Sequence, residues 1–199
     1  DHPFPTCLFN SPRPKNLPRR IPACYECNNG LSKDEELFRI FAASGMAYES
    51  NTGNRIWNEK IRSALQGRRP GLKPLIKSMA KPIVILNKAG LLLGTALILE
   101  VDPAPINRVI RKIAKGLYYL DTGKVLSSKV EILVEYENEK PERFFTPPLD
   151  DAIRSAKEVR LGRGEVIYWR NTIKDNPEES LTWIKFYEDK TFLICTSRK

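Results

Sequence analysis

The sequence predicts an α+β protein in which a small basic N-terminal module and a helical connector precede a mixed β-sheet domain with two helices. Six prolines between residues 3 and 22 exclude a helix there and predict an extended loop. Apolar residues then recur at helical spacing up to about residue 80, whereas short apolar runs bounded by turn residues are frequent in the rest of the chain. We therefore expect three parts, residues 1–45, 46–80 and 81–199.

In the first two parts, turn and capping residues indicate where each element begins. A short strand is expected at residues 19–23, where the Pro-rich loop ends. Ser32, followed three residues later by Glu35, predicts the N-cap and capping box of a helix that ends near residues 44–45. Further helices are expected over residues 54–66 and 72–79, and they form the connector.

The third part alternates between strands and helices. Residues 82–86 and 91–99 are apolar runs on either side of an Asn-Lys-Ala-Gly turn, and they predict a hairpin. Helices are expected over residues 103–117 and 149–159, and strands over 130–134, 165–169, 181–187 and 191–196. We interpret the three tryptophans as core residues rather than as stacking platforms for bases: they are Trp57, Trp169 and Trp183.

The composition of the chain excludes disordered, membrane-spanning and disulfide-rich proteins. Of 199 residues 41% are hydrophobic, which is enough to form a core. The longest apolar run, residues 90–99, is about half the length that a membrane span needs, and no signal-peptide pattern opens the chain. Four cysteines are too few for a disulfide scaffold. These observations predict a soluble, cytoplasmic protein.

The net charge of +9 is concentrated near the N-terminus. Residues 1–81 carry 14 Lys or Arg and 7 Asp or Glu, a net of +7, which leaves +2 for residues 82–199. A basic segment can be a solvated surface, but this surplus favours contacts with phosphates, which give salt-sensitive binding without reading sequence. The basic side of helix 103–117 is interpreted as the solvent face of an amphipathic helix. The residues predicted to bind nucleic acid are Arg13, Lys15, Arg19, Arg20, Lys33, Arg62, Arg68 and Arg69.

The first 28 positions contain the residue types that phosphodiester hydrolysis needs, which are a metal site and a base that activates water. Asp1 is a hard oxygen ligand, and the neighbouring His2 titrates near neutral pH. Cys24 and Cys27 have the C-x-x-C spacing with which two thiolates bind one zinc ion. Asn28 follows directly, at the start of a helix, and its amide oxygen can bind a divalent cation.

This order of motifs, Asp-His, then Asn16-Leu17, then Cys-x-x-Cys-Asn, resembles the HNH endonuclease family. The resemblance is to uncharacterised bacterial members; it is specific over residues 1–38 and much weaker over residues 107–123. It implies that the N-terminal module has the ββα-metal fold and that the protein cleaves DNA, with RNA left open as a substrate.

The resemblance also implies a role for each residue of these motifs. Asp1 and Asn28 would bind a catalytic Mg²⁺ or Mn²⁺ ion, and His2 would be the general base. Asn16 would orient His2. The two cysteines of the C-x-x-C motif, Cys24 and Cys27, would supply half of a structural Zn²⁺ site.

The sequence departs from the family pattern upstream of Asp1. In the family a second C-x-x-C precedes the Asp-His pair, whereas this chain begins with Asp1 and has no initiating Met. Cys7, in the Pro-rich loop, is a poor substitute for the missing ligands. We therefore expect an N-terminally incomplete chain that is impaired as a nuclease.

Two other interpretations of the N-terminal module stay open. The alternative function is a non-catalytic protein that binds nucleic acid or another protein through a degenerate zinc knuckle. A C-x-x-C pair can also be redox-active, but the Pro-rich approach and the Asn-Asn-Gly exit differ from the strand-to-helix setting of such pairs. The sequence contains no phosphate-binding Gly-rich loop, so a nucleotide cofactor is not expected.

Overall fold

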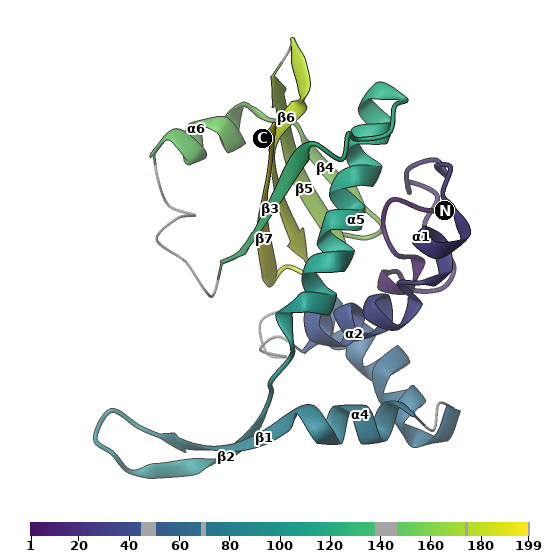
Figure 1. Ribbon diagram of the computed structural model, residues 1–199. Helices are drawn as coiled ribbons and strands as arrows, with labels where there is room; N and C mark the ends of the chain where they lie inside the picture. The colour runs from purple at the N-terminus through teal and green to yellow at the C-terminus, as the bar shows by residue number, and fades with distance from the viewer. Residues whose placement is uncertain (45–50, 69–70, 138–146, 174, 199) are drawn as a thin grey trace.

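A five-stranded antiparallel sheet with the strand order β3-β7-β6-β5-β4 lies at the centre of the protein (Figure 1). The computed structural model describes residues 1–44, 51–68, 71–137, 147–173 and 175–198. Every strand pair in it is antiparallel, so the predicted mixed sheet is wrong in this respect. Because β4 to β7 follow one another through short connections, each strand reverses the direction of the previous one. The strands are β3 (Val130–Tyr136), β4 (Glu158–Leu161), β5 (Val166–Ile173), β6 (Asn176–Phe186) and β7 (Lys190–Arg198).

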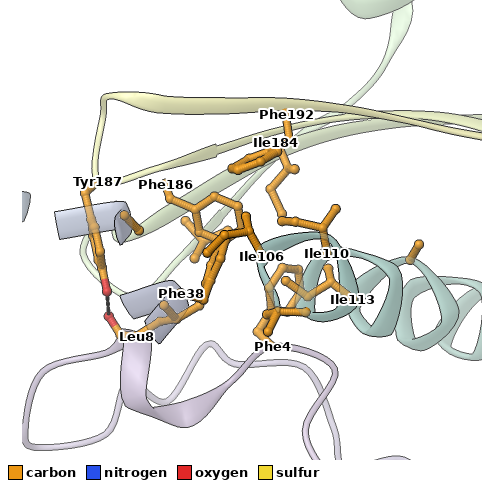
Figure 2. Close-up of a cluster of buried hydrophobic side chains, with 14 of the residues drawn as sticks. Phe4, Leu8, Phe38, Ile106, Ile110, Ile113, Ile184, Phe186, Tyr187 and Phe192 are labelled. Carbon is orange, nitrogen blue, oxygen red and sulfur yellow. Dashed lines mark hydrogen bonds between the residues drawn. The ribbon is translucent and has the colours of Figure 1, made fainter. Parts of the chain in front are cut away.

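The inner face of the sheet packs against helix α5 (Pro103–Thr122) and helix α2 (Ser32–Ala43). Asp102 caps α5 by accepting a hydrogen bond from the Ala104 amide, and Gly123 ends the helix in a left-handed conformation. Figure 2 shows Phe38 of α2 among side chains from the sheet, from α5 and from the N-terminal segment. The ring of Phe38 lies edge-on to that of Phe186, with 4.8 Å between ring centroids. Residues from all three predicted parts therefore share one core.

The opposite face of the sheet is covered in part by helix α6 (Pro147–Ser155) (Figure 1). Ile153 of this helix packs with Leu193 and Trp183. Trp169 lies directly opposite Trp183 in the ladder between β5 and β6, and both are half-buried, as is Trp57 against the main core. The prediction that the tryptophans are core residues is therefore confirmed only in part: Trp57 and Trp183 pack against hydrophobic clusters, but none of the three is fully buried.

The remaining helices and the hairpin follow the predicted order. α1 (Tyr25–Asn29) precedes α2, and α3 (Asn51–Ile56) continues through the π-helical segments η2 (Trp57–Arg62) and η3 (Ala64–Arg68) to α4 (Leu72–Met79). The hairpin consists of β1 (Ala80–Leu86) and β2 (Leu92–Leu99), and it extends away from the rest of the molecule (Figure 1). Among the residues described, no helix has both the length and the apolar character that crossing a bilayer requires.

Three local predictions are wrong. Residues 19–23 form no strand. Pro18 and Pro22 have no N–H to donate, and among the described residues only Ile21 of this segment pairs with another backbone residue in ladder fashion, which is Asp1. Ser32 forms no capping box: its hydroxyl donates to the Asn29 carbonyl at 2.9 Å, and Leu31 is the N-cap. The helix predicted over residues 149–159 ends at Ser155, and the chain then enters β4.

Candidate functional site

The first residues of the chain pair with the segment at Ile21 and lie against α5. Asp1 and Ile21 exchange two hydrogen bonds, of 2.8 and 2.9 Å, as opposed residues of an antiparallel ladder do. Pro3 lies so close to α5 that a Cβ added at Gly116 would lie 2.8 Å from the Pro3 Cβ. A glycine in the middle of this helix therefore allows the N-terminal segment to approach it.

The carboxylate of Asp1 is fixed by two donors. Its Oδ1 accepts from the His2 backbone N–H at 2.7 Å, and its Oδ2 lies 2.5 Å from the Nζ atom of Lys112 on α5. The same Nζ lies 2.6 Å from a carboxylate oxygen of Glu35 on α2. The side chain of Lys112 is only 12% exposed, so this ammonium group joins the N-terminus, α2 and α5 in a shielded ion-pair network.

The imidazole of His2 lies in a strongly cationic setting. The Nε atom of Arg20 donates to its Nε2 at 3.2 Å, whereas its Nδ1 is buried and has no partner among the described residues. Desolvation lowers the pKa of His2 below 6.5, and the charges of Arg13 and Arg20 lower it further. His2 is therefore neutral at pH 7, which is the state in which an imidazole accepts a proton.

One small polar cavity brings five of the predicted residues together. It has a volume of about 310 Å³, and its lining includes an acid, a base, an amide and two guanidinium groups. Thr6 is the one lining residue that the sequence did not indicate. The lining consists of Asp1, His2, Thr6, Arg13, Arg20 and Asn28.

Asn16 does not line this cavity, although it was predicted to orient His2. Its Nδ2 donates to the carbonyls of Arg160 and Gly162, both at 3.2 Å, and its Oδ1 accepts from the Gly162 amide at 2.9 Å. The side chain thus attaches the N-terminal segment to the turn between β4 and β5. This partner lies more than 140 residues away along the chain, so local motif reasoning could not find it.

The cysteines do not form a complete metal site within the described residues. Cys24 is exposed just before α1, and Cys27 lies in α1, with a side chain that falls outside the described part of the structure. Where side chains are described, no three His, Cys, Asp or Glu residues gather as metal ligands. The thiol of Cys7 donates to the Glu35 carbonyl at 3.5 Å, and burial raises its pKa to about 11. A thiol that stays protonated is a poor zinc ligand.

The predicted nucleic-acid-binding residues are distributed over more than one surface. Arg13 and Arg20 line the cavity, and Lys15 and Arg19 are exposed on the same N-terminal segment. The four others do not line the cavity: Lys33 is exposed at the start of α2, Arg62 is exposed on η2, the side chain of Arg68 is not described, and Arg69 lies outside the described residues.

Lys112 is the functional candidate that sequence reasoning missed. It was interpreted as part of the solvent face of α5, yet it holds Asp1 and Glu35. Arg108 of the same face is also paired, with Asp34. The acidic residues at the start of α2 are the signal in the sequence that could have suggested these pairs, because α2 and α5 both have apolar faces that must pack together.

Comparison with known proteins identifies no relative of this chain. No model of a protein family matches the sequence, no curated protein is significantly similar to it, and no solved structure resembles its fold significantly.

Proposed function

We propose that this protein is a metal-dependent endonuclease of the HNH type that hydrolyses phosphodiester bonds of DNA. The observation that carries the proposal is the shared cavity, in which a neutral imidazole, two oxygen ligands and two guanidinium groups face the same space. These are the groups that bind a phosphate, activate water and hold a divalent cation.

The guanidinium groups of Arg13 and Arg20 give the cavity affinity for a phosphodiester. Planar guanidinium groups bind phosphate oxygens through paired hydrogen bonds. In the free protein the Arg20 Nε–H donates to the His2 ring. When Arg20 turns to a phosphate, the Nε2 lone pair of His2 is released and can take a proton from water. Substrate binding and base activation are coupled in this way.

The ligand set fits a hard divalent cation such as Mg²⁺ or Mn²⁺. Asp1 and Asn28 supply oxygen atoms at one cavity, and each carboxylate oxygen of Asp1 keeps a lone pair beyond its present hydrogen bond. A bound ion would stabilise the charge that develops on the leaving oxygen. Lys112 would hold Asp1 in place and reduce its negative charge.

A structural zinc ion bound by Cys24 and Cys27 is part of the same proposal. The exposed position of Cys24 at the start of α1 leaves this residue accessible to further ligands. Elemental analysis of the purified protein tests this point directly.

A second function is favoured by the cationic character of the cavity. Arg13, Arg20 and Lys112 all lie near His2, and Lys112 already neutralises Asp1. A site of this kind can bind a phosphate without cleaving it, as in a non-catalytic nucleic-acid-binding protein.

Cleavage of supercoiled plasmid in Mg²⁺ or Mn²⁺ separates the two functions. We expect nicking by the wild-type protein and at least a 100-fold loss in His2→Ala, because general-base catalysis typically contributes about 10²–10⁴-fold. The matched control is Lys157→Ala, an exposed residue of the near-neutral part of the chain. Salt-sensitive binding without nicking would support the non-catalytic function, and equal nicking by His2→Ala would exclude the proposed base.

A further inference from the structure

The hairpin of β1 and β2 is a preformed apolar arm, which we define as residues 80–99. Seven residue pairs join its strands, from Ala80 with Leu99 to Leu86 with Leu92. The turn is closed by Asn87, whose Oδ1 accepts from the amides of Ala89 and Leu91, both at 2.9 Å. The apolar arm therefore has a defined shape, although it forms a separate sheet that extends away from the main one (Figure 1).

The apolar arm exposes large hydrophobic side chains along its whole length. Most of the exposed large hydrophobic residues of the described chain belong to it, and the exposed fraction reaches 71% at Leu97. They are Ile83, Val84, Ile85, Leu86, Leu91, Leu92, Leu93, Leu97 and Ile98.

Both faces of the apolar arm are hydrophobic. Side chains alternate between the two faces of a strand, so Ile83 and Ile85 lie on one face and Val84 on the other. An antiparallel hairpin exposed to water normally has one polar face, and an isolated two-stranded hairpin is marginally stable. The sequence of the apolar arm is thus that of a buried element.

The exposed area is large enough for a stable protein interface. The nine side chains expose on the order of 900 Å², which compares with about 800 Å² per partner in a standard interface. The exposed hydrophobic patch of a typical monomer is about 300–600 Å². An uncovered arm of this size would promote aggregation.

A lipid bilayer is a poor partner for the apolar arm. A two-stranded sheet has two open edges, and each unpaired backbone group costs several kcal/mol in hydrocarbon. A protein strand, by contrast, pairs with an open edge, and its apolar side chains contact those of the strand beside it. The partner must therefore supply both backbone donors and apolar side chains.

The two edges of the apolar arm differ, and this difference selects the pairing edge. β1 contains Pro82, which has no N–H to donate and protects that edge from pairing. β2 contains neither proline nor a charged residue from Leu92 to Leu99. At the base of the arm, Lys81 is paired with Glu100. Because β2 has no charged side chain, two copies of this chain, each with a net charge of +9, repel each other least where they meet along β2.

We propose that the apolar arm is a dimerisation element in which β2 pairs antiparallel with β2 of a second copy of this chain. The same surface of both copies forms such a twofold interface, and the result is a four-stranded sheet in the order β1-β2-β2-β1. Apolar side chains of one β2 strand contact those of the other β2 strand across the new pair, on both faces of the sheet. This inference does not depend on the proposed nuclease function.

Sedimentation equilibrium of the intact chain tests the proposal. Over about 1–100 μM, a range that covers weak dimers with interfaces of this size, we expect the wild type to have twice its mass of 22.8 kDa. Leu92→Lys and Leu97→Lys place a charge on side chains that are 68% and 71% exposed, and each should give a monomer. The matched control is Val125→Lys, at a residue that is 85% exposed outside the apolar arm, and it should remain dimeric.

A folded monomer of the Lys variants is verified by a wild-type circular dichroism spectrum and a cooperative melting transition, at a temperature lowered only by the stability that dimerisation adds. A wild type that is monomeric over the whole range overturns the proposal, as does a dimer that survives both Lys substitutions. Wild-type monomer that co-sediments with phosphatidylcholine vesicles would assign the arm to a lipid surface instead.

Cysteine cross-linking tests the pairing of β2 with β2. Leu93→Cys, Thr95→Cys and Leu97→Cys place a thiol at alternate positions of the strand. We expect at least one of them to form a disulfide-linked dimer on oxidation, well above the level of the wild type with its native cysteines. No cross-link at any of the three positions would rule out this pairing.

Discussion

The hydroxyl of Tyr187 donates a 2.8 Å hydrogen bond to the carbonyl of Leu8, and this bond attaches the N-terminal segment to the sheet (Figure 2). The two residues are 179 positions apart, and both are fully buried. Burial raises the pKa of Tyr187, so the phenol stays protonated and able to donate. The candidate cavity is built on the segment that this bond holds.

Tyr187→Phe should therefore destabilise the protein while leaving the packing of the ring intact. A buried carbonyl left without a partner costs about 1–3 kcal/mol. We expect this loss in the free energy of unfolding measured by urea titration. The control is Tyr168→Phe, a half-buried ring whose hydroxyl has no hydrogen bond to the described residues. Equal stability of the two variants would show that the bond to Leu8 contributes nothing.

Gly116→Ala should separate the N-terminal segment from α5. Alanine favours a helix interior over glycine by up to about 1 kcal/mol, but here its Cβ would lie 2.8 Å from the Pro3 Cβ and 2.9 Å from its Cα. Overpacking of this kind costs about 1–3 kcal/mol. We expect a lower melting temperature and weaker DNA binding, because Asp1 and His2 are displaced with Pro3.

Gly71→Ala is the control for this substitution, since a Cβ at Gly71 meets no atom within 4 Å. Its melting temperature should change by less than that of Gly116→Ala. A Gly116→Ala protein as stable as the wild type would mean that Pro3 moves aside without cost.

Elements with a strong local pattern could be predicted from the sequence, whereas contacts between distant segments could not. Helix α5 has an apolar stripe, an Asp cap and a C-terminal Gly, and the hairpin has two apolar runs around a turn. In contrast, β4 is only four residues long and begins three positions after the last residue of α6. Its four residues carry too little periodicity to separate it from the preceding helix.

The candidate site shows the same limit. The Asp-His and Asn28 motifs and the nearby arginines were predicted from short-range patterns, and the structure places them around one cavity. The ion pair of Lys112 with Asp1 and the hydrogen bonds of Asn16 to the β4–β5 turn both join residues more than 100 positions apart. Only the packing of the N-terminal segment on α5 and the sheet creates them.

Asn16→Ala tests the structural role that this geometry gives Asn16. The substitution removes three hydrogen bonds to the backbone of Arg160 and Gly162. Because these groups are exposed and water can replace the amide, we expect a loss of about 1 kcal/mol in stability. The pH profile of any nicking activity should not change. A shifted profile at unchanged stability would support the predicted role of Asn16 in orienting His2.

Arg13→Ala combined with Arg20→Ala should weaken DNA binding uniformly across sequences. Each phosphate contact contributes about 0.9 to the slope of log K against log salt, so the slope should fall by about 2. Fluorescence anisotropy with a labelled duplex over a salt series measures it. The control is the double variant Lys129→Ala and Lys157→Ala, which removes two exposed charges from the near-neutral part of the chain. An equal fall in the slope for both double variants would argue against a phosphate site at the cavity.

Cys7 should react far more slowly than an exposed thiol in the native protein. Burial raises its pKa from 9.0 to about 11, which lowers the thiolate fraction at pH 8 about 100-fold. Labelling with iodoacetamide followed by peptide mass spectrometry should show modification of the exposed Cys24 and protection of Cys7. In urea, Cys7 should lose this protection. Equal rates at the two cysteines of the native protein would contradict the assigned burial.

The same shift makes stability depend on pH in the alkaline range. Between pH 9 and pH 11 the unfolded chain releases the Cys7 proton while the folded chain keeps it, so the unfolded state binds fewer protons and stability falls as pH rises. Two pH units correspond to about 2.7 kcal/mol as an upper bound. Because other groups also titrate there, the measured quantity is the difference between the wild type and Cys7→Ala. We expect the wild type to lose more stability than the variant between pH 9 and pH 11, and parallel losses would show that Cys7 ionises at its ordinary pKa.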